Sequence, residues 1–368
     1  KAAAELITRV SNRMEESSIR FNLNEMYLGT FHSICLRWLR EHREFTRLKR
    51  NFMMMDQFDQ QYFIYQNLNE FDDIEDIELV SATVNNWQRT QDIAKWVNVV
   101  SEEALYPSEL LTASDAEVRA LGRCAQRYQE LLSEANALDF SSIQFEALRL
   151  LQNHPQILEE LQSRISHVMV DEYQDTNTIQ EALLKTLMAG DNPNLCVVGD
   201  DDQGLYRFRG ATIRNILQFR DNYSNCKQVS LETNYRSHQE IIGFYNRWMN
   251  DQRWTHKGQA FRYAKTIQPE EKAFPDVPVV VRVGTDSIEG WHEEVLSFLH
   301  ALRDQGNLTD WNQIAFLFRS VKHDRVKGLA EFLESSGIPV YSPRSNQFFD
   351  REEIRLMLGA LIFLFPQF

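Results

Sequence analysis

Two short apolar runs, each followed at once by adjacent acids, limit what this chain can fold into more than any other feature. Residues 168–170 lead directly into Asp171 and Glu172, and residues 195–199 lead into the three aspartates 200–202. Apolar runs of this length are typical of strands that are buried in a parallel sheet. Ligands of such sheets bind at the carboxyl ends of the strands. The sequence therefore predicts a phosphate and metal site at this edge of a parallel sheet.

The segments around these runs favour an alternation of strands and helices. Such alternation implies a parallel sheet with right-handed crossovers. A polar connection at 251–276 is expected before a second alternation, in which Gly337 signals the end of a helix. The predicted strands are 167–171, 194–199, 227–231, 277–283 and 314–318, and the predicted helices are 178–189, 211–220, 237–250, 291–303, 322–335 and the segment from 350 onward.

The stretch from about residue 45 to residue 135 has a different character. Glycine is nearly absent, with Gly122 the sole example, and Pro107 is the only proline. Apolar residues recur at helical spacing, so we predict an all-helical insertion whose acidic segment 70–78 is its most solvated part. Before the insertion, the expected elements are a helix at 1–16, a strand at 26–29 and a helix at 31–42 capped by Thr30.

Composition narrows the class of protein. The 368 residues suit about two to three domains. A net charge of −14 argues mildly against coating nucleic acid by charge alone, although a local groove can still be basic. The four cysteines are scattered without a Cys-x-x-Cys pair, which favours a reduced, cytoplasmic protein without a zinc site. No apolar run approaches the ~20 residues of a membrane span, so no membrane partner is expected.

The acids after the first predicted strand have two possible roles. Asp171 can hold Mg²⁺ through its water shell, and Glu172 can orient and deprotonate an attacking water. Alternatively, both are exposed acids that cap the next helix together with Asp175 or Thr176. For the pair alone the capping role is favoured, and the neighbouring segments reverse that balance.

Three further segments support a site for nucleotide and nucleic acid. The triplet 200–202 crowds like charges, which is unfavourable unless a cation or basic group offsets them, and Gln203 can bond a phosphate oxygen without carrying charge. Aromatic and basic residues alternate in 204–210, which suits stacking on bases and binding of phosphates. Arg236 can contact a γ-phosphate, and Tyr235 can stack on a purine. The alternatives are a solvated acidic turn, core aromatics and a surface Tyr-Arg pair.

Together these segments resemble the UvrD/Rep/PcrA helicases of superfamily 1. The resemblance rests on Val170-Asp-Glu-Tyr-Gln-Asp-Thr-Asn177, Val198-Gly-Asp-Asp-Asp-Gln203, Tyr206-Arg-Phe-Arg-Gly-Ala211 and Leu231-Glu-Thr-Asn-Tyr-Arg-Ser237. Weaker echoes are Lys1-Ala-Ala, Thr30-Phe-His-Ser33, Leu138-Asp-Phe140 and Phe348-Phe-Asp-Arg-Glu-Glu-Ile354. The order and spacing of these segments match the family along nearly the whole chain.

The resemblance implies an α/β fold, in which a RecA-like parallel-sheet motor domain carries an all-helical insertion and is followed by part of a second RecA-like domain. Residues 1–45 and 136–225 would form the first motor domain, 46–135 the insertion, and 226–368 the second motor domain.

The resemblance also implies ATP and Mg²⁺ as cofactors and single-stranded DNA as a partner. Asp171 resembles the family's metal ligand, Glu172 its general base and Gln203 its γ-phosphate sensor. Tyr235 resembles the ring that stacks on adenine, and Arg236 resembles the arginine finger. The residues that resemble DNA contacts are Thr30, Phe31, His32, Tyr206, Phe208 and Arg209.

Departures from the family pattern bear on the expected activity. The phosphate-gripping run Gly-x-x-x-x-Gly-Lys-Ser/Thr does not occur in the sequence, and the late motifs of the family are missing. We therefore expect a fragment truncated at both ends, with little or no ATP hydrolysis of its own. In addition, Phe208 stands where many members carry Trp, and Gly204 stands where Ser is common.

The parent protein is expected to be an ATP-dependent DNA helicase or translocase. By resemblance it moves 3′ to 5′ on single-stranded DNA and acts at junctions between single-stranded and double-stranded DNA, as enzymes of DNA repair do. Three alternatives stay open: the motor part of a helicase–nuclease subunit, a non-catalytic DNA-binding module, and an RNA-directed motor.

Overall fold

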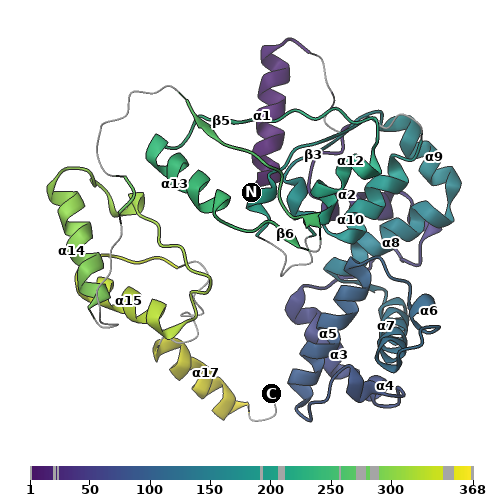
Figure 1. Ribbon diagram of the computed structural model, residues 1–368. Helices are drawn as coiled ribbons and strands as arrows, with labels where there is room; N and C mark the ends of the chain where they lie inside the picture. The colour runs from purple at the N-terminus through teal and green to yellow at the C-terminus, as the bar shows by residue number, and fades with distance from the viewer. Residues whose placement is uncertain are drawn as a thin grey trace. The chain divides into compact units, whose positions relative to one another are not determined.

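The computed structural model describes residues 2–19, 22, 25–190, 194–205, 212–256, 258–270, 279–281, 290–342 and 352–365 (Figure 1). By its internal contacts the chain divides into two compact units. The first unit contains residues 1–231 and 252–265, and the second unit contains residues 232–251 and 266–368.

The parallel pair of strands predicted around the acidic segments is confirmed. In the first unit, β3 (Val168–Val170) pairs in parallel with β4 (Leu195–Val197). The crossover between the two strands carries α10 (Thr178–Leu187), as predicted. The ladder extends one residue beyond β4, because the Val198 N–H donates to the Val170 carbonyl at 2.8 Å. Both acidic segments therefore leave the same edge of a parallel pair.

Helices of the first unit cover one side of this pair. The strands are not buried on both faces as predicted, because Met169 is 80% and Val198 50% exposed. The predicted helix after Thr30 is α2 (Phe31–Glu41), and α8 (Phe140–Asn153) packs against both α2 and α10 (Figure 1). α9 (Pro155–Arg164) follows directly and packs against α8. The predicted first helix is α1 (Ala2–Glu16). Burying apolar side chains on nearly every side of α8 makes it the centre of the main core of this unit.

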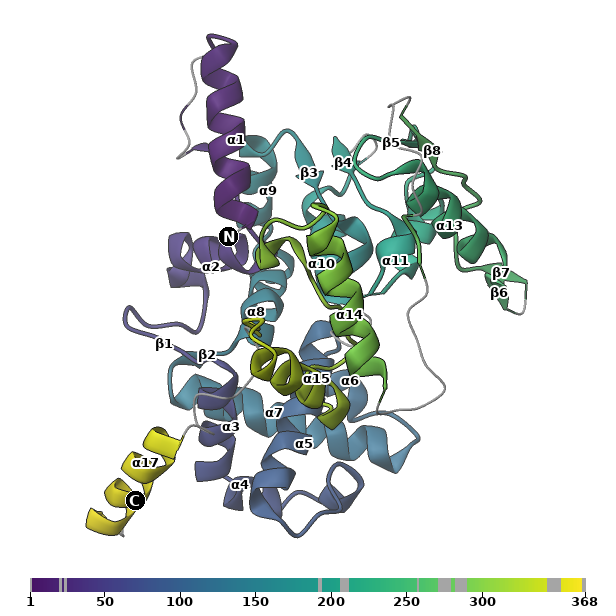
Figure 2. The ribbon, with the colours of Figure 1, turned by 90° about the vertical axis from the view of Figure 1, so that its left-hand side faces the viewer.

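The stretch predicted as an all-helical insertion is mostly helical and has a hydrophobic core of its own. The chain enters and leaves it through β1 (Met53–Met54) and β2 (Ala137–Leu138), which pair in parallel. Figure 2 shows its helices grouped apart from β3 and β4. These helices are α3 (Gln57–Gln66), α4 (Asn69–Asp72), α5 (Asn86–Glu102), α6 (Pro107–Leu110) and α7 (Ala116–Glu134).

The acidic segment of this stretch is exposed, as predicted, but it is not simply solvated. Several of its carboxylates form ion pairs with arginines that α5 and α7 supply. The pairs are Glu70 with Arg127, Asp72 with Arg89, and Glu75 and Asp76 with Arg123.

The second unit contains four helices longer than ten residues among its described residues. They are α13 (Gln239–Asn250), α14 (Trp291–Asp304), α15 (Asp324–Ser335) and α17 (Glu352–Leu364), close to the predicted spans. A small apolar core joins α14 and α15. Gly337 follows α15 at a φ of +81°, which confirms the predicted end signal. Within the described residues, no helix is both long and apolar enough to cross a bilayer.

Three predicted strands, at 26–29, 227–231 and 314–318, are wrong. A strand needs a neighbour that takes up its backbone hydrogen bonds, and these segments have none among the described residues. In 26–29 the Tyr27 ring instead packs on α2, with the guanidinium of Arg37 4.2 Å from the ring centroid. The predicted strand 277–283 falls largely outside the described residues.

Two other segments differ in detail from the prediction. The helix predicted at 211–220 is two short helices, α11 (Arg214–Leu217) and α12 (Phe219–Asn222). The polar connection contains a hairpin of β6 (Thr255–His256) and β7 (Gln259–Ala260) in the first unit. In the second unit, β5 (Thr233–Asn234) pairs in parallel with β8 (Gln268–Pro269).

Candidate functional site

Asp171 and Glu172 lie at the carboxyl end of β3, and both are exposed. Glu172 has a left-handed backbone conformation, with φ 52° and ψ 42°. For a residue with a side chain this conformation costs about 1–3 kcal/mol, and strain of this kind is concentrated at functional sites. The Glu172 N–H donates to Asp171 Oδ1 at 3.0 Å, which fixes the turn between the two residues.

The capping alternative for these acids does not hold. The cap of α10 is Asn177, whose side chain accepts from the Gln180 N–H at 3.2 Å while the Gln180 side chain reaches back to the Asn177 N–H. Both Asp171 and Glu172 therefore remain available for a ligand.

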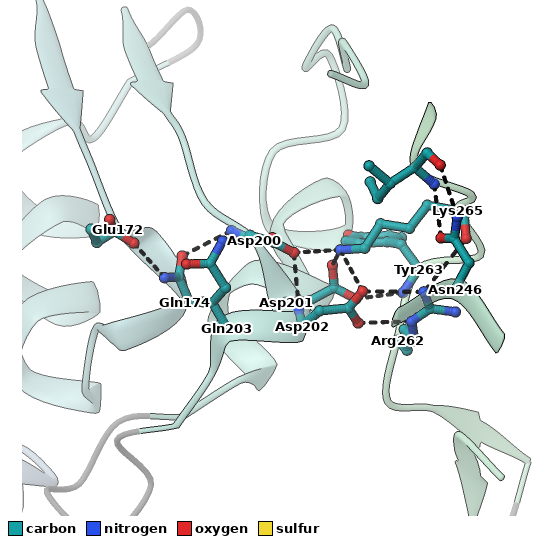
Figure 3. A network of polar contacts seen from close by, with 11 residues as sticks. Glu172, Gln174, Asp200, Asp201, Asp202, Gln203, Asn246, Arg262, Tyr263 and Lys265 are labelled. Carbon is teal, nitrogen blue, oxygen red and sulfur yellow. Dashed lines mark hydrogen bonds and ion pairs between the residues drawn. The ribbon is translucent and has the colours of Figure 1, made fainter. Parts of the chain in front are cut away.

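Gln174 connects this strand end to the next one (Figure 3). Its side-chain nitrogen donates to Glu172 Oε2 at 2.6 Å, and its side-chain oxygen accepts from the Asp200 N–H at 2.9 Å. Gln174 lies in η4 (Tyr173–Asp175) and is 1% exposed. The sequence does not single it out, because a glutamine four residues after the end of a strand is informative only once its burial is known.

The turn after β4 holds Gln203 at the same edge. Asp200 caps η5 (Asp201–Gln203) by accepting from the Asp202 N–H at 3.1 Å. Its other carboxylate oxygen accepts from Gln203 Nε2 at 2.8 Å. Gln203 is exposed, so a ligand can reach its carboxamide. The structure thus brings Asp171, Glu172 and Gln203 to one edge of the strand pair.

Basic side chains offset the charge of the aspartate triplet. Lys265 Nζ lies 2.5 Å from Asp200 Oδ1, 2.5 Å from Asp201 Oδ1 and 3.3 Å from Asp202 Oδ2. Arg262 makes a bidentate contact with Asp202, at 2.7 and 3.1 Å. Both come from the segment predicted as a polar connection. Their partners are at least sixty residues away, and a local sequence pattern does not reveal contacts over that distance.

The ion pair shifts the pKa values of both partners. Burial acts to raise the pKa of Asp200, but the hydrogen bonds from Lys265 and Gln203 outweigh it and hold the pKa below its ordinary value. Burial acts to lower the pKa of Lys265, and its bonds to Asp200 and Asp201 raise it instead. Both groups are therefore charged at neutral pH, and the triplet is occupied by protein cations.

Asp171 is the side chain of this edge that best suits a metal ion. Mg²⁺ is commonly bound through one or two carboxylates and completes its shell with waters and substrate phosphates. No group of three or more His, Cys, Asp or Glu side chains among the described residues is arranged to hold a metal on its own. One exposed carboxylate fits an ion that arrives with a phosphate ligand.

The predicted DNA contacts at the start of α2 lie close to β3. Thr30 caps the helix by accepting from the Ser33 N–H at 3.3 Å. Phe31 is half-buried and packs against the cluster of Val170 and Tyr173 beneath the strand end. A base that stacks on Phe31 would therefore press on the packing that supports Asp171 and Glu172.

His32 is held by two residues of α8. Gln144 Nε2 lies 2.9 Å from His32 Nδ1, and the Phe140 ring meets the imidazole edge-on with centroids 5.7 Å apart. Burial lowers the pKa of His32, so the ring is neutral at pH 7. Phe140 is 55% exposed and extends the same surface, although the sequence marked it only as a weak echo. The other predicted DNA contacts, Tyr206, Phe208 and Arg209, lie outside the described residues.

Tyr235 and Arg236 belong to the second unit, and both are exposed. Asn234 shapes the turn that carries them, because its side-chain oxygen accepts from the Arg236 N–H at 2.9 Å and from the Ser237 N–H at 2.8 Å. These bonds fix the backbone that carries both side chains.

Comparison with known proteins agrees with this arrangement. Residues 1–224 match the model of the UvrD/REP helicase N-terminal domain, and residues 229–366 match that of the UvrD-like helicase C-terminal domain. The chain is 30% identical over 370 residues to the ATP-dependent DNA helicase PcrA of Staphylococcus epidermidis, covering 98% of this chain and 46% of that protein. It is 32% identical over 372 residues to the ATP-dependent DNA helicase UvrD1 of Mycobacterium tuberculosis, covering 98% of this chain and 45% of that protein.

The chain thus spans slightly less than half the length of these relatives. The two domain models together cover nearly all of it, in the order that the acidic strand ends and the Asn-Tyr-Arg turn occupy along the sequence. The RecA-like fold class expected from the sequence agrees with these matches and with the parallel pair of β3 and β4. The chain belongs to the UvrD/REP helicase family.

Proposed function

We propose that the protein is an ATP-dependent DNA helicase or translocase that moves 3′ to 5′ along single-stranded DNA and acts at junctions of single-stranded and double-stranded DNA in the cytoplasm. The observation that carries the proposal is the hydrogen-bonded path from Glu172 through Gln174 to Asp200 and Gln203. Such a path joins a candidate base to a candidate phosphate-sensing amide.

The nucleotide chemistry assigned to these residues follows from their donors and acceptors. Asp171 would hold Mg²⁺, which neutralises charge on the transferred phosphoryl group when bound. Glu172 accepts the proton of the attacking water, and Gln203 hydrogen-bonds the γ-phosphate. In the second unit, Tyr235 stacks on adenine and Arg236 stabilises the charge of the transition state.

The DNA contacts proposed for the chain combine rings, neutral polar groups and one arginine. Phe31 and Phe140 offer ring faces for stacking, and Thr30 and His32 lie beside them. Tyr206, Phe208 and Arg209 are proposed to extend the same track. Stacking tolerates every base, so low sequence specificity is expected.

We also propose the division expected from the sequence, with 1–45 and 136–225 as the first motor domain, 46–135 as its insertion and 226–368 as the second motor domain. The separate hydrophobic core of the insertion supports it. A polypeptide of residues 1–368 alone contains no Gly-x-x-x-x-Gly-Lys-Ser/Thr run, so little ATP turnover is expected from it.

Steady-state ATP hydrolysis by the whole protein tests the proposal. We expect stimulation by single-stranded DNA oligonucleotides and a markedly smaller effect of RNA oligonucleotides of the same sequence. Translocation can be followed with a fluorophore placed at the 3′ or the 5′ end of the strand, and arrival at the 5′ end is expected. The proposal would be contradicted if single-stranded DNA did not stimulate ATP turnover, or if RNA stimulated it equally.

A further inference from the structure

We propose that Gln174 is a positioning residue that sets the place of the Glu172 carboxylate relative to Gln203. The inference rests on the function proposed above and adds a role for a residue between the two groups. Gln174 itself is 1% exposed, so it acts on the site through Glu172 and Asp200, which it contacts.

The orientation of the Gln174 carboxamide is fixed by its two partners. A carboxylate only accepts hydrogen bonds, and a backbone N–H only donates them. The nitrogen must therefore face Glu172 Oε2 and the oxygen must face the Asp200 N–H, as their distances of 2.6 and 2.9 Å show. Turning the amide over would break both contacts, so the side chain has one stable position.

Gly199 makes room for this position. A Cβ atom built on Gly199 would lie 2.7 Å from the side-chain oxygen of Gln174 and 3.2 Å from its backbone nitrogen. A Cβ atom there would also lie 2.9 Å from Ile216 Cδ1, and contacts shorter than 3.0 Å require a neighbouring side chain to shift. The glycine after β4 thus allows the carboxamide to reach the end of the neighbouring strand.

The conformation of Glu172 explains why its carboxylate needs such a contact. The left-handed backbone at this residue aims the side chain away from the path a normal strand end would give it, into an exposed position. An exposed glutamate otherwise populates several rotamers. The bond from Gln174 selects one of them.

The same network reaches Gln203. The Asp200 N–H donates to the Gln174 side-chain oxygen, and the Asp200 carboxylate accepts from Gln203. Lys265 donates to the other oxygen of the same carboxylate (Figure 3). Glu172 and Gln203 are therefore linked through two side chains that are themselves held. An in-line attack requires a fixed position of the base relative to the group that binds the phosphate.

The test compares Gln174→Leu, Gly199→Ala and the double variant in the whole protein. We expect each single variant to lower kcat for DNA-stimulated ATP hydrolysis by about 10²-fold, because a base displaced by about 1 Å loses that much. KM for ATP should change by no more than about threefold, since the ATP-binding groups stay. The double variant should be no worse than the poorer single variant, because both act on the same contact.

Matched controls separate this role from a general effect on folding. Gln162→Ala removes an amide on α9 that donates to the Leu187 carbonyl of α10, and Gly243→Ala adds a methyl group at ordinary contact distance in α13. Both should leave kcat unchanged. Should Gln174→Leu fail to fold, Gln174→Glu keeps the acceptor for the Asp200 N–H, loses the donor to Glu172, and should show the same loss of kcat.

Two results would overturn the inference: a folded Gln174 variant with the wild-type kcat, or additive losses in the double variant. Failure of the proposed function looks different, because the wild-type protein would then show no DNA-stimulated turnover at all. If Glu172→Gln abolished turnover and Gln174→Leu left it at the wild-type level, the positioning role of Gln174 would be contradicted and the proposed function would not.

Discussion

At the scale of one residue, the carboxylate of Glu172 is placed by a strained backbone and by a hydrogen bond from a neutral amide. The left-handed turn sets the direction of the side chain, and Gln174 sets its end point. Asp171, Glu172 and Gln203 could be placed at one edge from the sequence, because residues that follow two neighbouring parallel strands leave at the same edge. Gln174 could not, because its role depends on a contact with Asp200, twenty-six residues away.

His32 carries a prediction about pH. Burial lowers the pKa of His32, so as the pH falls the unfolded chain takes up this proton before the folded chain does. The neutral His32 ring stabilises the folded chain fully above the pKa of an unfolded histidine, about 6.5. This stabilisation is lost as the pH falls below that pKa. The free energy of unfolding should therefore fall less steeply for His32→Gln than for wild type between pH 7 and pH 5.

Urea unfolding of both proteins at several pH values measures this difference in slope. Other titrating groups are shared by the two proteins and cancel in the comparison. Parallel profiles would show that His32 is equally easy to protonate in the folded and unfolded chains.

At the scale of elements, the residue that caps the start of α8 also joins this helix to the helical stretch 46–135. Asp139 caps α8 by accepting from the Ser142 N–H at 2.8 Å, and it also accepts from the Tyr128 hydroxyl and from Gln60 Nε2. Tyr128 and Gln60 belong to the helical stretch 46–135, so the cap ties that stretch to α8. Asp139 is 3% exposed, which removes water as a substitute partner.

Asp139→Ala should therefore destabilise the chain by about 3 kcal/mol. Loss of a cap costs about 1 kcal/mol, and a buried donor left without an acceptor costs about 1–3 kcal/mol. Asp115→Ala is the matched control, since Asp115 is an exposed cap of α7 with one backbone contact at 2.8 Å, and about 1 kcal/mol is expected. Equal losses in the two variants, measured by urea unfolding, would exclude the joint role of Asp139.

Two of the predicted strands that the structure does not contain also show how elements depend on their neighbours. Residues 227–231 place apolar side chains at alternate positions and residues 314–318 are a short apolar run, and both patterns favour a strand. Leu231 is nevertheless 82% and Leu317 92% exposed, and no described strand lies beside either. Helices were placed more accurately than strands because a helix satisfies its own backbone hydrogen bonds, whereas a strand depends on a partner that local sequence does not name.

At the scale of the whole molecule, the largest surprise is the segment 252–265, which leaves the second unit and packs within the first. Its Lys265 neutralises the aspartate triplet that the sequence left open to a cation or a basic group. The need for a counter-charge was predictable from three adjacent carboxylates. The identity of the counter-charge was not, because sixty-five residues separate Lys265 from Asp200.

The role proposed for Glu172, the base of a DNA-stimulated ATPase, is tested most directly with Glu172→Gln in the whole protein. ATP binding, measured with a fluorescent nucleotide, and hydrolysis in the presence of single-stranded DNA are followed side by side. Glu160→Gln on the exposed face of α9 is the control for loss of one negative charge.

We predict that Glu172→Gln lowers kcat by at least about 10²-fold while the Kd for ATP changes by no more than about threefold, because the amide cannot take the proton of the attacking water but leaves the nucleotide contacts in place. Turnover by Glu172→Gln within about tenfold of wild type would contradict the account, because loss of a general base costs more than that.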